Sequence, residues 1–224
     1  MTDAPDTART AALLRCGVIA GPLYVGVGLL EMFFRDGFDP RRHALSLMSN
    51  GSLGWIQIGS FIVSGALVVA FAIGVRRALA PGRTATGGPR LLAMYGLGMI
   101  GAGIFVADPM DGFPPGTPPG PPVAPSWHGP LHFVAGGIGF FALIAACFVF
   151  ARRFAADGEG GWAGFSLATG ILFLVGFMGI ASGVKSPWVV LGFTATVVLV
   201  WVWIGALSLR LRATLATPSQ LRRR

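Results

Sequence analysis

GPLHFVAGGIGFFALIAACFVFA, residues 129–151, is an apolar run without a single acidic residue, lysine or arginine. It is long enough to cross ~30 Å of hydrocarbon as a helix. Apolar residues follow one another in it without the period-2 alternation of a membrane strand, so a helix is expected. Five further apolar runs accompany it, and together they predict an all-α fold, a polytopic bundle of six transmembrane helices. The six predicted spans are 14–34, 55–76, 91–107, 129–151, 162–181 and 188–209.

The composition of the whole chain excludes an ordinary soluble domain. Hydrophobic residues make up 54% and charged residues only 12% of the 224 residues, whereas soluble domains are about 25% charged. The net charge of +8 does not indicate nucleic-acid binding, because the basic residues flank apolar spans as topology signals do. The expected partner is the lipid bilayer, with no nucleic acid.

The distribution of the 17 basic residues predicts the orientation. Six crossings place both termini on one side, and most of the arginines belong to that side. The positive-inside rule therefore predicts a multi-pass protein of the cytoplasmic (inner) membrane with both termini in the cytoplasm. The predicted parts are a cytoplasmic tail (1–13), the six-helix domain (14–210) and a basic cytoplasmic tail (211–224). The basic residues predicted to face outward are Arg35, Arg41, Arg42 and Lys185.

One face of the first span combines small and polar residues. It bears Gly17, Gly21, Tyr24, Gly28 and Glu31, which follow a 4-3-4-3 spacing. Small residues let helix backbones approach closely in a membrane. We therefore expect this face to pack against protein and not against lipid.

Polar residues gather at the predicted outer ends of the spans, and all three histidines of the chain are among them. We expect a ligand-binding cluster there, in which the polar groups would hold a lipid headgroup, a small molecule or a metal. The ligand-binding candidates are Glu31, His43, Ser46, Asp108 and His132.

A metal site is one interpretation of this cluster. His128 and His132 are four residues apart, so both rings lie on one helix face and could bind one divalent metal such as zinc. Asp108 and His43 would complete the ligand set. The alternative is structural, with the histidines hydrogen-bonding at the interface and capping the helix.

Several segments carry a resemblance to a known family. They are GPLY (21–24), DPRRHALSLMSNGSLGWIQIGSF (39–61), VADPMDG (106–112) and WHGPLH (127–132). In these the chain resembles a bacterial family of six-helix membrane proteins catalogued only as a domain of unknown function. The likeness spans residues 16–209. It implies the six-helix fold and no particular activity.

Three functions are compatible with these features, and whether the protein is an enzyme stays open. The first is binding or sensing without turnover at the outer cluster. The second is a metal-dependent hydrolase acting on a lipid, distantly similar to membrane zinc hydrolases of the alkaline ceramidase and adiponectin receptor type, with Ser46, Asp108 and the histidine pair. Those enzymes have seven helices and carry the pair on the last one. The third is a small transporter with an inverted repeat, suggested by GPLY (21–24) and GPLH (129–132).

Overall fold

The fold is entirely helical over the described part of the chain. The computed structural model describes residues 4–79 and 84–216, in which there are six α-helices, one short 3-10 helix and no strand. This confirms the all-α prediction. The elements are α1 (Ala4–Phe34), η1 (Leu45–Ser49), α2 (Gly54–Leu79), α3 (Thr84–Ile104), α4 (His128–Ala156), α5 (Gly160–Ala181) and α6 (Pro187–Ala216).

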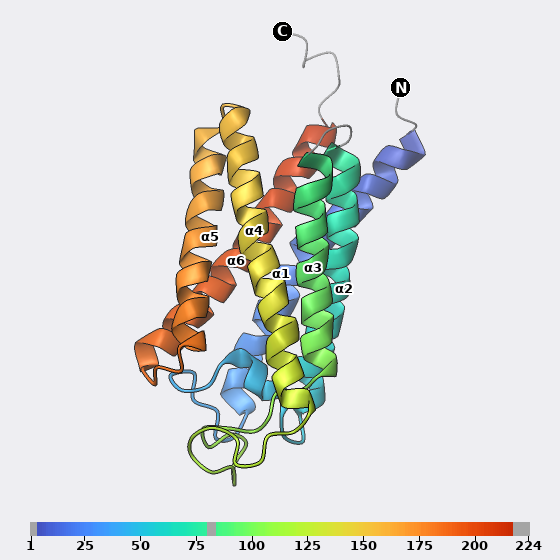
Figure 1. Cartoon of the computed structure of the whole chain (residues 1–224). Helices are drawn as coiled ribbons and strands as arrows, with labels where there is room; N and C mark the ends of the chain where they lie inside the picture. The colour runs from blue at the N-terminus through green and yellow to red at the C-terminus, as the bar shows by residue number, and fades with distance from the viewer. Residues whose placement is uncertain (1–3, 80–83, 217–224) are drawn as a thin grey trace.

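The six helices form a closed ring. Each helix packs against its neighbours in sequence, and α1 packs against α6 to complete the circle. As Figure 1 shows, α1 begins and α6 ends at one end of the bundle, and the two long loops lie at the other end. We call these the capping loops; they comprise residues 35–53, which include η1, and residues 105–127.

The helices are of membrane-spanning type. Five of the six are long and apolar enough to cross a bilayer, which indicates a multi-pass membrane protein. The exception is α3, which begins with the polar segment 84–90 and contains six glycines. The prediction of six crossings therefore stays a prediction.

The helices extend further than the apolar spans. α1 begins at Ala4 and α6 continues to Ala216, so helix replaces much of the two predicted tails. Hydropathy marks only the apolar part of a helix, whereas backbone hydrogen bonding continues until a residue interrupts it. The remainder of the predicted tails, residues 1–3 and 217–224, lies outside the described residues.

The glycine face of α1 packs against protein, as predicted. A Cβ on Gly17 would lie 2.7 Å from the Phe71 ring, and one on Gly21 would lie 3.3 Å from the Trp201 carbonyl oxygen. Tyr24 and Glu31, further along the same face, are buried.

α2 and α3 approach each other closely through a pair of glycines. A Cβ on Gly65 would lie 2.6 Å from the carbonyl oxygen of Gly96, and the reverse distance is also 2.6 Å. On the other side of α3, a Cβ on Gly98 would lie 2.7 Å from the Cα of Gly139 in α4. Backbone therefore meets backbone at both contacts, and a single added methyl group would push the helices apart.

This contact predicts that two glycine-to-alanine changes on α2 alter the thermal stability in opposite directions. Alanine normally favours a helix over glycine by about 1 kcal/mol. Gly59→Ala should therefore keep or raise the thermal stability of the purified protein, because no neighbouring atom lies within 4 Å of a Cβ there. Gly65→Ala should lower it, because the added Cβ meets rigid backbone. Equal midpoints for the two variants in a melting experiment would contradict close α2–α3 packing.

Candidate functional site

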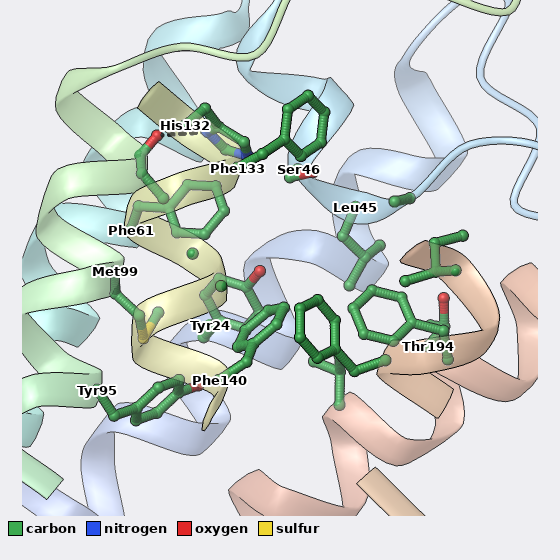
Figure 2. Close-up of a pocket in the computed structure, with 18 residues that line it drawn as sticks. Tyr24, Leu45, Ser46, Phe61, Tyr95, Met99, His132, Phe133, Phe140 and Thr194 are labelled. Carbon is green, nitrogen blue, oxygen red and sulfur yellow. Dashed lines mark hydrogen bonds between the residues drawn. The ribbon is translucent and has the colours of Figure 1, made fainter. Parts of the chain in front are cut away.

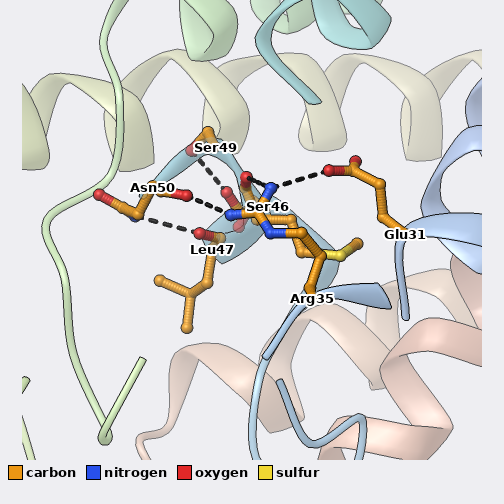
Figure 3. Close-up of polar contacts among 7 residues, drawn as sticks. Glu31, Arg35, Ser46, Leu47, Ser49 and Asn50 are labelled. Atoms are coloured by element: carbon orange, nitrogen blue, oxygen red, sulfur yellow. Dashed lines mark hydrogen bonds and ion pairs between the residues drawn. The ribbon is translucent and has the colours of Figure 1, made fainter. Parts of the chain in front are cut away.

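The first capping loop is built around a buried arginine. The Arg35 side chain is only 5% exposed and follows the last turn of α1. Its Nη1 donates to Glu31 Oε1 at 2.9 Å and to the Met48 carbonyl at 2.9 Å, and its Nη2 donates to the Asn50 carbonyl (Figure 3). One guanidinium thus joins the end of α1 to the C-terminal end of η1. Buried charges require such pairing, because desolvation is otherwise very costly.

The second capping loop docks onto the first through Phe113, which is 1% exposed. The Arg35 guanidinium lies 5.4 Å from the Phe113 ring centre, and the rings of Phe38 and His43 lie 5.4 and 5.5 Å from it. Lys185, from the loop between α5 and α6, forms an ion pair with Asp111 at 2.7 Å. All three loops at this end of the bundle are therefore joined.

His43 uses both ring nitrogens within these loops. Its Nδ1 accepts the Asp39 backbone N–H at 2.9 Å, so the proton of the neutral ring is on Nε2, which donates to the Asp111 carbonyl at 3.0 Å. Neither nitrogen then has a lone pair left for a metal. Nearby, at the exposed edge of the loop, the side chain and backbone N–H of Arg41 donate to the Asp39 carboxylate and hold its pKa below the usual value.

The other candidates lie where α3 ends and α4 begins. A helix end leaves carbonyl groups without partners, and His132 Nδ1 donates to two carbonyls there, those of Ala102 at 2.8 Å and Phe105 at 2.9 Å. His128 Nδ1 bonds the Val106 carbonyl at 2.7 Å. The Asp108 carboxylate accepts the Ser126 backbone N–H at 3.0 Å. These bonds join the two helices in the way that the structural interpretation of the histidines anticipates.

This geometry gives the metal-site prediction no support. In residues 4–79 and 84–216, no group of three or more His, Cys, Asp or Glu side chains is placed to hold one metal ion. A catalytic zinc needs three protein ligands and an open position.

Beneath the capping loops, the ring of helices encloses a cavity of about 120 Å³ (Figure 2). All six helices and the η1 segment contribute to its wall, which is mostly apolar and rich in aromatic rings. Its volume is close to that of a cavity of ~150 Å³ that accommodates benzene. The wall consists of Tyr24, Ala44, Leu45, Ser46, Phe61, Tyr95, Met99, Ala102, His132, Phe133, Gly136, Gly137, Phe140, Phe177, Ile180, Phe193, Thr194 and Val197.

Two of the five ligand-binding candidates, Ser46 and His132, share this wall. Glu31, His43 and Asp108 are not part of it, and each bonds a residue of the capping loops. Sequence reasoning thus selected residues of one end of the bundle, but it did not separate those that line the cavity from those that order the loops.

The sequence analysis did not select Arg35 or Phe113, and it considered Tyr24 only as a packing residue. A signal for Arg35 was available, since Glu31 and Arg35 are four residues apart and would meet on a helix. Phe113 had no comparable signal, because its partners come from the other capping loop.

The ring of apolar helices and the cavity within it define a multi-pass helical membrane protein of unknown activity. More specifically, the chain belongs to the family described as "Protein of unknown function (DUF998)", whose family model matches residues 18–210. The resemblance seen in the sequence is thereby confirmed. No curated protein and no solved structure matches the chain.

The central role of Arg35 predicts a large effect of its removal. Arg35→Ala leaves the buried Glu31 carboxylate and two loop carbonyls without their donor, which should cost about 3–5 kcal/mol of unfolding free energy. Arg41→Ala is the matched control, because its ion pair with Asp39 is exposed and should contribute little. Thermal unfolding in detergent micelles measures both. Similar midpoints for the two variants would show that the buried pair does not hold the loop.

Proposed function

We propose that the protein binds the apolar part of a membrane lipid, or of a similar small amphipathic molecule, in the cavity beneath the capping loops. The proposal rests on the cavity itself. Ligand sites are typically concave and largely apolar, with a few polar groups that orient the ligand. The aromatic wall would surround an apolar group, and Ser46 and His132 would contact a polar one.

The position of Phe133 supports access from the lipid. Phe133 lines the cavity and is also 54% exposed on the outside of the bundle. This side chain of α4 therefore reaches both the cavity and the outer surface of the bundle. Rotation of this side chain would let an acyl or isoprenoid chain enter from the side.

The hydrolase and transporter interpretations are not supported by the geometry of the described residues. A lipid hydrolase would use a metal site, and the histidines instead bond backbone carbonyls. The transporter interpretation requires broken helices, whereas each of the six described helices runs unbroken between its ends. Binding without turnover therefore remains the proposal.

We further propose that all six helices cross the cytoplasmic membrane and that both termini face the cytoplasm. The ring supports this topology, because α3 packs along α2 on one side and α4 on the other. Both of these neighbours are long and apolar enough to span the bilayer, and a helix packed along both lies at the same depth.

A reporter that is active only in the cytoplasm tests this topology. Fused after Arg224, it should be active; inserted in the second capping loop near Gly116, it should be silent. The same reporter fused ahead of α1 should also be active; if α3 did not cross, the two termini would lie on opposite sides of the membrane and the two terminal fusions would disagree.

Filling the cavity should abolish lipid binding without damage to the fold. Gly136 lines the cavity, and no neighbouring atom lies within 4 Å of a Cβ at this position. Gly136→Leu should therefore be accommodated and occupy the space. Gly192→Leu is the matched control, because Gly192 has equally free surroundings and lies outside the cavity wall.

The readout is labelling of the buried Met99 by a phospholipid with a photoactivatable group at the end of its acyl chain. Met99 is 4% exposed, so lipid on the outer surface of the protein does not reach it. We expect labelling in the parent protein and in Gly192→Leu, and a loss of about tenfold in Gly136→Leu, which corresponds to ~1.4 kcal/mol of binding free energy. Equal labelling of the two variants would contradict the proposed site.

A further inference from the structure

The cavity has hydrogen-bonding groups at two opposite ends. At the end near the capping loops is His132. Because carbonyl oxygens only accept, the two bonds from Nδ1 to Ala102 and Phe105 place the proton of the neutral ring on Nδ1. Nε2 is then an acceptor, and no residue in the described part of the chain bonds it. A hydroxyl group of a ligand would suit this nitrogen.

The other end of the cavity lies deeper in the bundle and is formed by two tyrosines. The Tyr24 and Tyr95 rings lie 5.2 and 5.7 Å from the ring of Trp201, and both tyrosines line the cavity. In Figure 2, His132 and Tyr95 lie at opposite ends of the group of side chains, with Tyr24 and Met99 between them.

Buried polar atoms without partners adjoin this deep end. The Gln57 amide borders the Tyr24 hydroxyl, yet within the described residues neither its nitrogen nor its oxygen meets hydrogen-bond geometry. Trp201 Nε1 is likewise buried without an acceptor there. An unpaired buried polar group costs about 1–3 kcal/mol. Gln57 and Trp201 do not line the cavity themselves, but both adjoin Tyr24, which does, so a polar group that reaches Tyr24 also comes next to them. Trp201 Nε1 and the Gln57 amide nitrogen can only donate and suit an oxygen acceptor, whereas the Gln57 amide oxygen suits a donor; a hydroxyl group can serve as both.

Between the two ends the wall is aromatic. The Phe61 ring lies 6.0 Å from His132 and 5.5 Å from Tyr24, and so links one end to the other. Phe140, Phe177 and Phe193 line the rest. Faces and edges of aromatic rings pack well against another flat ring, and the volume of about 120 Å³ is close to that of a cavity that holds one six-membered ring.

We propose that the cavity binds the ring of a lipid-soluble phenol with an oxygen at each end, that is, a hydroquinone carrying an apolar tail. One hydroxyl donates to His132 Nε2, and the oxygen at the far side of the ring accepts from the group around Tyr24 and Gln57. The tail leaves past Phe133 into the lipid. The inference rests on the proposed function, since it specifies which amphipathic molecule the same cavity takes.

The test compares three probes with one short isoprenyl tail: the hydroquinone, its oxidised quinone, and a phenol that keeps a single hydroxyl. Binding to the full-length protein in lipid nanodiscs is measured by calorimetry. We expect the hydroquinone to bind about tenfold more tightly than either other probe, because each of them leaves one end without its hydrogen bond. Equal affinity for all three, or tighter binding of the quinone, would overturn the proposal. A phenol that equals the hydroquinone while the quinone binds weakly would also overturn it, because the deep end would then have no role.

Two variants connect the affinity to the two ends. Gln57→Leu replaces an unpaired buried amide with an apolar side chain of similar size, so the protein should fold at least as well, but its affinity for the hydroquinone should fall about tenfold. His132→Gln should reduce the preference for hydroquinone over quinone. Gly192→Leu, outside the cavity, should change neither. If Gln57→Leu folds and binds normally, the deep end is not a ligand contact and the proposal fails.

The phospholipid labelling at Met99 separates this inference from the proposed function. Labelling at Met99 without binding of any ring would refute the hydroquinone and leave the lipid site intact. Absence of both would refute both.

Discussion

Contact between the backbones of neighbouring helices is the constraint on which the rest of the molecule depends. In lipid there is no hydrophobic force that draws one apolar helix to another, so close packing has to supply the attraction. Gly65 and Gly96 let α2 and α3 touch, and Gly98 and Gly139 do the same for α3 and α4. Further along the bundle, aromatic residues such as Phe140 and Phe177 line the cavity between the helices.

The capping loops supply a part of the cavity wall that the helices do not provide. Leu45 and Ser46 of the first loop form part of the cavity wall, and Arg35 holds that loop through bonds to Met48 and Asn50. The same guanidinium is paired with Glu31 and covered by Phe113. A charge this deeply buried is stable only with its complete set of partners. Loss of any one of them would therefore affect the shape of the cavity as well as the loop.

The histidines illustrate how one sequence pattern supports different chemistry in different surroundings. The four-residue spacing of His128 and His132 suits a shared metal, but it suits equally well separate bonds to carbonyls at the end of α3 and just after it. His43 has both nitrogens engaged by backbone groups. Only His132 combines an engaged nitrogen with a place in the cavity wall. This combination makes it the histidine best suited to contact a ligand, as a fixed and neutral acceptor.

The sequence by itself determined the helical membrane class, the number and approximate positions of the helices, the packing face of α1 and the end of the bundle where polar residues gather. These properties depend on local composition and on the 3.6-residue period, which can be read along the chain. The tertiary structure alone decided that α1 meets α6, that Arg35 organises the loops, and that Ser46, His132, Tyr24 and Tyr95 border one cavity. Each of these relations joins residues from distant segments, and such contacts depend on side-chain shape and on the complete set of hydrogen-bond partners, which no local pattern records.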